Sequence, residues 1–133
     1  MGTYVALQLV KSMMKRGAAV RGARVLIMGL TFKENTPDLR NSRVIDIIRE
    51  LQEFDVAVDV YDPWADPEEA RDEYGIFLVS EPERGSYNGI ILAVAHRQFR
   101  DMGADGIHAL GAPGHVMYDL KYVLPSGAAD LRL

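Results

Sequence analysis

The sequence predicts an α/β fold, a three-layer Rossmann-like parallel sheet with helices on both faces, preceded by one long helix. Short apolar runs alternate with helical segments along the chain, which is typical of strand–helix–strand units joined by right-handed crossovers. The apolar runs are continuous, as expected for strands buried on both faces of a sheet. The expected strands cover residues 25–28, 56–61, 89–94 and 116–120, with a short edge strand over residues 76–79.

The expected helices follow from apolar spacing and from capping residues. Residues 43–54 carry one buried stripe and one charged face, and this helix should begin near Asn41 or Ser42, because both are good N-caps. The remaining expectations are a helix over residues 67–74 with Asp66 as its N-cap and Gly75 after its end, one or two short helices over residues 96–110 broken at Gly103 or Gly106, and a loose tail over residues 126–133.

The first helix, expected over residues 3–16, has an unusually broad apolar surface. A helix of a small domain usually buries one face and leaves the other in water. This helix either packs deep in the core, or also packs on something outside this sequence, such as another domain or a second subunit. Its two apolar stripes are Tyr4, Leu7, Val10 and Met14, and Val5, Leu9 and Met13.

Composition excludes several classes of function. The 133 residues are about the size of one domain, and the hydrophobic content of 48% supplies a core. A net charge of −4 argues against a nucleic-acid partner, and no apolar run approaches the roughly 20 residues of a membrane span. There is no cysteine, and no His, Asp or Glu cluster has the spacing of metal ligands. We therefore expect no metal and a cytoplasmic protein.

The long polar loop over residues 29–42 is the strongest functional signal. It follows a buried strand, and in open parallel sheets ligands bind beyond the carboxyl ends of the strands. Lys33 and Arg40 could hold a pyrophosphate, since lysine supplies a point charge and arginine a planar fork. Alternatively, Arg40 pairs with Asp38 on the surface and Lys33 is merely solvated. A dinucleotide fingerprint needs three glycines at this turn, and only Gly29 is present, so NAD is not expected to bind here in the usual way.

Two further residues lie near expected strand ends. His96 is either a turn or cap residue or a general base. Trp64 follows Asp62-Pro63 and either stacks on a nucleobase or covers the edge of the sheet.

The loop sequence GLTFKENTPDLRNS at residues 29–42, together with VYDP at residues 60–63, closely resembles the C-terminal domain of the UDP-glucose/GDP-mannose dehydrogenase family. The resemblance runs from the first helix to about Pro125. Details of both motifs, with AVAH at residues 93–96 and YDLK at residues 118–121, are most similar to the branch that acts on UDP-N-acetylhexosamines, which includes the enzymes of Vi-antigen and O-antigen polysaccharides.

The resemblance implies an enzyme that oxidises C6 of a nucleotide sugar to a carboxylate, using NAD and a catalytic cysteine. Residues 1–22 would be the end of its central dimerisation helix, and residues 23–133 its C-terminal nucleotide-sugar-binding domain. The N-terminal NAD-binding domain and the cysteine have no counterpart here, so NAD would be bound mainly by that missing domain. The implied partners are a UDP-sugar, the N-terminal domain and a second copy that pairs through the first helix.

The resemblance also assigns substrate-binding residues. Lys33 matches the lysine of the family's Phe-Lys motif, which lies by the substrate phosphate and sugar, and Phe32 matches the residue whose backbone contacts the substrate. Arg40 matches the motif arginine. Lys121 stands where many members carry an arginine that reaches the substrate, and lysine there lacks the bidentate fork.

Three functions remain open from the sequence: the binding domain of a dehydrogenase that is inactive without the rest, a stand-alone nucleotide-sugar-binding module, and an interaction domain built around the first helix.

Overall fold

The computed structural model describes residues 2–133 and contains one five-stranded parallel sheet with the strand order β2-β1-β3-β4-β5. The α/β fold class is confirmed. Residues 76–79, expected as an edge strand, form only a parallel bridge between Leu78 and Val60. The strands are β1 (Arg24–Met28), β2 (Ala57–Tyr61), β3 (Tyr87–Leu92), β4 (Gly111–Asp119) and β5 (Leu131–Arg132).

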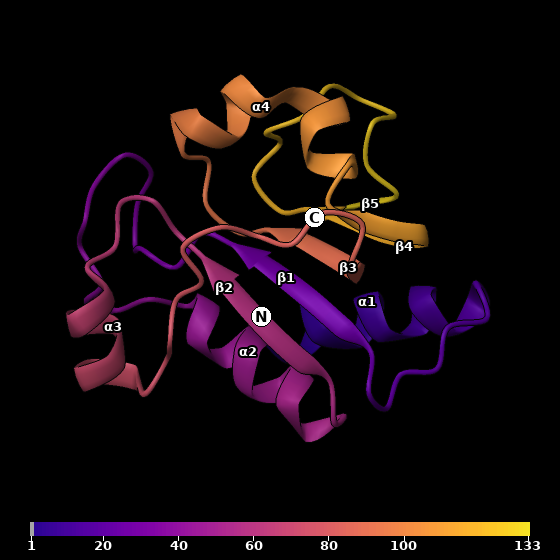
Figure 1. The fold of residues 1–133 in the computed structure, drawn as a ribbon, viewed down its shortest axis with the longest axis horizontal. Coiled ribbons are helices and arrows are strands. Elements are labelled where there is room, and N and C mark those ends of the chain that lie inside the picture. The colour runs from indigo at the N-terminus through magenta and orange to yellow at the C-terminus, as the bar shows by residue number, and fades with distance from the viewer. Residues whose placement is uncertain (1) are drawn as a thin grey trace.

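Helices cover both faces of this sheet, so the three-layer arrangement is confirmed. Figure 1 shows α1 and α2 together on one face and α4 on the other, while α3 lies beyond the β2 edge. Their bounds are α1 (Gly2–Lys15), α2 (Val44–Glu53), α3 (Pro67–Tyr74) and α4 (Arg97–His108). The predicted caps of α3 are present, since Asp66 accepts a hydrogen bond from Glu68 N–H and Gly75 is left-handed. The break in α4 falls at Gly103.

Alternate residues of the strands divide the core in two. Val25 and Ile27 of β1 pack on the side of α1 and α2, whereas Leu26 and Met28 pack on the side of α4, and all four are fully buried. This period of two is the geometry of a strand, and a continuous apolar run satisfies both faces at once.

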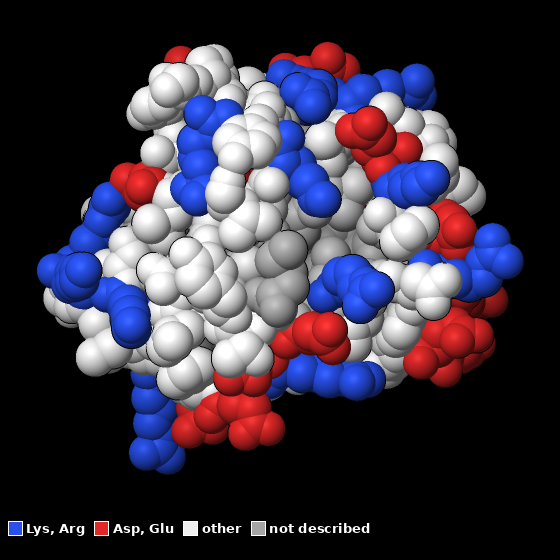
Figure 2. All heavy atoms as spheres, turned by 180° about the vertical axis from the view of Figure 1, so that it is seen from behind, with Lys and Arg blue, Asp and Glu red and all other residues white. Residues whose placement is uncertain are grey.

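One apolar stripe of α1 is buried within the chain. Leu9 and Met13 are inaccessible to solvent and press against Gly89 of β3, where a Cβ would lie 3.2 Å from a Leu9 methyl group. Of the other stripe, Tyr4 and Met14 remain 55% and 60% exposed, whereas Val10, expected beside them, is buried. The view from behind shows a broad uncharged area on the side where α1 lies, with charged side chains around its rim (Figure 2).

The expected start of α2 at Asn41 or Ser42 is wrong. The helix begins at Val44, and its N-cap residue Arg43 makes no side-chain cap. Ser42 instead donates its hydroxyl to the Leu30 carbonyl at 2.6 Å, and Asn41 adopts a left-handed conformation with φ 58°. Ser42 thus closes the preceding loop through a contact to a residue twelve positions earlier, which local capping rules do not anticipate.

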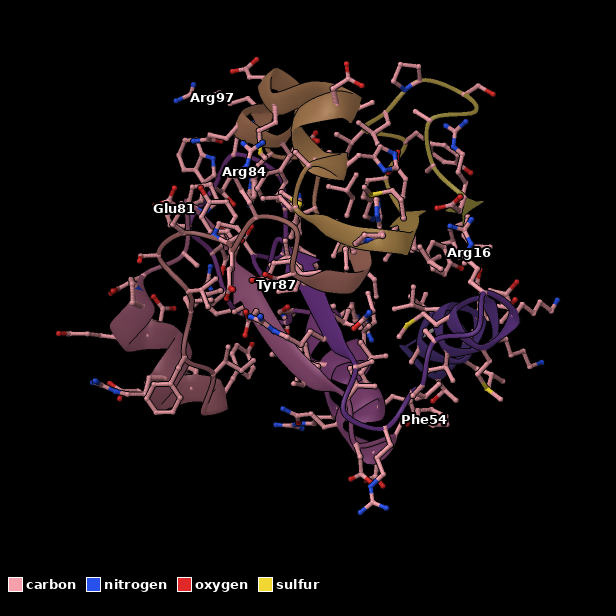
Figure 3. All side chains as sticks on the ribbon, turned by 45° about the vertical axis from the view of Figure 1, so that its right-hand side comes forward. Arg16, Phe54, Glu81, Arg84, Tyr87 and Arg97 are labelled. Atoms are coloured by element: carbon pink, nitrogen blue, oxygen red, sulfur yellow. The ribbon has the colours of Figure 1, made fainter. Side chains whose placement is uncertain are left out.

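The expected loose tail is also wrong in part, because Leu131 and Arg132 add β5 to the sheet beside β4. Asp130 anchors this segment: its carboxylate accepts the Met117 backbone N–H at 2.8 Å and pairs with Arg16 at the end of α1. Figure 3 shows Arg16 beside the C-terminal segment. Within residues 2–133, no helix has the length and apolar character that a membrane crossing requires.

Candidate functional site

The sheet reverses its direction of growth between β1 and β3. The chain leaves β1 through α2 to reach β2 on one side, then returns to place β3 on the other side. At such a switch point the two connections diverge beyond the carboxyl ends of the strands, and ligands of open α/β sheets bind in the crevice between them. The loop after β1 and the turn after β3 therefore enclose the expected site.

A pocket lies at this position. Its volume is about 450 Å³, and its lining includes Phe32 and Lys33 from the loop after β1, Val94 and Ala95 after β3, and Lys121 after β4. A second, smaller pocket of about 200 Å³ adjoins it and shares Phe32, Val94 and Lys121 with it. The structure thus brings together three of the four residues that the sequence singled out.

The larger pocket has two lysines, one aromatic ring and one carboxylate, that of Glu34, at its wall, so the cations outnumber the anion by one. The Lys33 ammonium lies 5.8 Å from the centre of the Phe32 ring, which is 46% exposed. Lys121 follows the buried Asp119, whose carboxylate accepts its backbone N–H and so fixes the turn after β4. Two ammonium groups beside an exposed aromatic face suit an anionic ligand that carries a planar ring.

Arg40 lies outside both pockets and pairs with Asp38. Its guanidinium and its backbone N–H both donate to the Asp38 carboxylate, at 3.0 and 2.9 Å, and these hydrogen bonds lower the pKa of Asp38. The surface ion pair considered from the sequence is therefore present for Arg40. The Asp38 carbonyl also accepts the Phe32 backbone N–H at 2.8 Å, which closes the loop on itself. That N–H is consequently engaged within the chain, and the phenyl ring is the part of Phe32 left exposed at the pocket.

Asp62, directly after β2, anchors the start of the loop that follows β1. The buried Asp62 carboxylate accepts the backbone N–H groups of Leu30 and Thr31 at 2.7 and 3.0 Å, and His96 lies 3.0 Å from the same oxygen. Its other oxygen accepts the N–H of Trp64 and that of the next residue. Burial alone would raise the pKa of Asp62, but the hydrogen bonds from His96 and the loop backbone outweigh it and lower the pKa. The ionised Asp62 carboxylate thus connects the loop after β1 with His96, which follows β3.

A family model for the UDP-binding domain of UDP-glucose/GDP-mannose dehydrogenases matches residues 26–126. The chain belongs to this family.

Two bacterial relatives align with the whole chain. A UDP-N-acetyl-D-glucosamine 6-dehydrogenase of Pseudomonas aeruginosa is 60% identical, and one of Salmonella typhi is 53% identical. The chain spans only 32% and 31% of their lengths. It therefore corresponds to about a third of these relatives.

Solved structures of two nucleotide-sugar dehydrogenases share the fold. A UDP-glucose dehydrogenase from Pyrobaculum islandicum superposes with a TM-score of 0.71 at 31% identity, covering 97% of this chain and 29% of that one. An NDP-N-acetyl-D-galactosaminuronic acid dehydrogenase from Methanosarcina mazei gives a TM-score of 0.76 at 20% identity, covering 92% and 26%. The latter likeness is one of fold alone.

The single glycine at the first strand end of this family domain serves packing. Gly29 has φ 104°, and a Cβ there would lie 2.6 Å from the Val94 Cβ. It therefore lets the loop after β1 pass close to the turn after β3, where a dinucleotide fingerprint would need glycines for a tight turn over a pyrophosphate. The residues present do not fit NAD.

Trp64 lines neither pocket and instead packs against the start of α4. It is half-buried, its indole N–H donates to Gln98 at 2.9 Å, and the Arg97 guanidinium lies 5.2 Å from its ring centre. Of the two interpretations from the sequence, this geometry favours the cover.

Sequence reasoning missed Arg43, which lies at the start of the helix expected over residues 43–54, is exposed, and lines the smaller pocket with Val44 and Ile47. Its place directly after the loop, at the ligand end of the sheet, was the signal available. Among residues 2–133, no group of three or more acidic or histidine side chains is placed to hold a metal ion.

Proposed function

We propose that this chain is the UDP-sugar-binding part of an NAD-dependent nucleotide-sugar 6-dehydrogenase. The observation that carries the proposal is the pocket at the switch point, with Lys33 and Lys121 at its wall. A diphosphate bears charge that two ammonium groups can neutralise, and the exposed Phe32 ring offers a face for a planar base. The alignment of the whole chain with about a third of two UDP-N-acetyl-D-glucosamine 6-dehydrogenases supports a UDP-N-acetylhexosamine as the substrate, oxidised to the uronate. The product would serve a surface polysaccharide, as the resemblance of the loop motif implies.

In this proposal the chemistry lies outside the chain. There is no cysteine to act as the nucleophile, and the turn at Gly29 does not suit a dinucleotide. NAD and the catalytic cysteine would come from the N-terminal part of a longer cytoplasmic protein, whose central helix would end in residues 1–22, with residues 23–133 forming the binding domain.

The 133-residue chain alone is therefore expected to produce no NADH from any UDP-sugar, whereas a longer protein that carries an N-terminal domain like that of its relatives should oxidise UDP-N-acetylglucosamine. Absorbance at the NADH band, followed with both proteins side by side, checks this. NADH formation by the short chain would contradict the proposal. Binding of UDP-sugars by a protein that lacks any N-terminal extension in its natural form would instead favour the stand-alone module.

We further propose that α1 pairs with a second copy through its exposed stripe. Tyr4, Leu7 and Met14 are large apolar side chains left at the surface, and a contiguous exposed apolar patch usually marks a contact site. Met14→Glu is expected to abolish concentration-dependent association in analytical ultracentrifugation. Gln52→Glu on the outer face of α2 adds the same charge elsewhere and should leave association unchanged. A wild-type chain that sediments as a monomer at every concentration would overturn this proposal.

A further inference from the structure

His96 is a fully buried histidine that the binding pocket does not use. It directly precedes α4, and its ring hydrogen-bonds to two segments distant in sequence. Nδ1 accepts the backbone N–H of Asn35 at 3.0 Å, so this nitrogen carries no proton. The ring is thus the neutral tautomer with its proton on Nε2, which donates to the Asp62 carboxylate at 3.0 Å. Thr31 Oγ1 lies 3.2 Å from the same nitrogen and donates to the Lys33 carbonyl.

Asn35 forms the other half of this connection. His96 is the N-cap residue of α4 but provides no side-chain cap. The cap comes instead from Asn35, whose Oδ1 accepts the Arg97 backbone N–H at 2.8 Å. Figure 3 places Arg97 at the start of α4. Asn35 is left-handed with φ 56°, a conformation that asparagine tolerates better than most residues. The loop after β1 is therefore fastened to the turn after β3 by both the backbone and the side chain of one residue.

These contacts bracket Lys33. Thr31, two residues before it, and Asn35, two residues after it, both contact the His96 ring. Neither His96 nor Asn35 belongs to the lining of the two pockets described above. Asn35 can therefore influence a ligand only through the loop that carries Phe32 and Lys33, whereas His96 contacts that loop and also directly follows Ala95 of the pocket lining.

We propose that His96 and Asn35 are positioning residues, which hold this loop in the conformation that binds the nucleotide diphosphate. The proposal rests on the proposed function for its ligand. A loop fixed before binding has no conformational freedom left to lose when the ligand arrives. If release of the loop leaves one molecule in ten in the competent conformation, the apparent dissociation constant rises about ten-fold.

Asn35→Gly isolates the positioning role, because glycine keeps the left-handed backbone but removes the cap on Arg97. Asn41→Gly is the matched control: Asn41 lies in the same loop, is also exposed and has φ 58°, and its side chain makes no hydrogen bond within residues 2–133. Amide hydrogen exchange of residues 32–38 in the free chain and calorimetric affinity for UDP are measured on both. We expect faster exchange and an affinity loss of about ten-fold for Asn35→Gly, and neither change for Asn41→Gly.

Two substitutions of His96 separate positioning from stability. An asparagine side chain reaches the place of Nδ1 and can still accept the Asn35 N–H, whereas a glutamine reaches the place of Nε2 and can still donate to Asp62. UDP affinity should therefore be retained better in His96→Asn, even though His96→Gln keeps the contact to the buried carboxylate and should melt at the higher temperature.

The positioning role would be overturned if the UDP affinities of His96→Asn and His96→Gln simply followed their melting temperatures. Equal amide exchange in Asn35→Gly and Asn41→Gly would overturn it as well. If the unsubstituted chain binds no UDP, the proposed function fails instead, and the exchange rates alone still decide whether His96 and Asn35 hold the loop.

Discussion

Replacing Lys33 with alanine is expected to weaken UDP binding by about ten- to a hundred-fold, because one hydrogen bond to a charged group is worth roughly 1.5–3 kcal/mol. Lys33 lies at the carboxyl end of β1 and lines the larger pocket at the switch point. Its side chain is exposed, so the substitution should hardly change the melting temperature. Isothermal titration calorimetry and thermal unfolding on the same samples check both parts.

Arg40→Ala is the matched control for this experiment. Arg40 is a cation of the same loop and is also exposed, but it lines neither pocket and pairs with Asp38. Its removal should change the UDP affinity less than two-fold. Equal losses in the two variants would mean that the loop acts only through its net charge, and an unchanged affinity in Lys33→Ala would leave Lys33 as a solvated residue.

Replacing Asp62 with asparagine is expected to lower the free energy of unfolding by about 3–5 kcal/mol, because a carboxylate oxygen that accepts buried N–H groups becomes an amide that also donates. Asp62 accepts four backbone N–H groups and the His96 ring, and its side chain is inaccessible to solvent. Asp66→Asn makes the same chemical change at the N-cap of α3, where asparagine caps as well as aspartate, so it should cost little. Urea denaturation of the three proteins checks the difference.

The pH dependence of the Asp62 effect has a definite sign. Because the pKa of Asp62 in the folded protein is below its ordinary value of 3.8, its ionised form stabilises the fold at neutral pH, and this contribution is lost as the pH falls from about that value through the folded-state pKa. The stability difference between wild type and Asp62→Asn should therefore shrink in acid. A difference that stays constant from pH 7 to pH 3 would show that the carboxylate charge is not what stabilises the corner.

Most of the fold could be predicted because its strands are buried on both faces. The continuous apolar run over residues 25–28 predicts a central strand without tertiary information, and the caps of α3 are local signals. The start of α2 and the strand β5 could not be read in this way. Ser42 is used by the Leu30 carbonyl, and Leu131 pairs with Tyr118, so long-range partners decided both.

Some residues of the candidate site could also be predicted from the local sequence, whereas the role of another depends on distant partners. Phe32, Lys33 and Lys121 follow strand ends in the sequence, and a parallel sheet brings such ends to one edge. The role of His96 could not be predicted, because its partners Asn35 and Asp62 lie 61 and 34 residues away along the chain. The sequence shows only that a histidine follows a strand. Its two hydrogen-bond partners, and so the connection between the two loops, become visible only in the folded structure.

The central claim is that the pocket at the switch point binds the UDP part of a nucleotide sugar. Calorimetric titration of the chain with UDP, uridine and NAD tests it most directly, since the lysines should recognise the diphosphate. The titration is done at low ionic strength, where salt screens the attraction between the lysines and the phosphates least. We expect UDP to bind, uridine to bind at least ten-fold more weakly because it lacks the phosphates, and NAD to give no saturable heat. Absence of UDP binding, or equal affinity for UDP and uridine, would contradict the account.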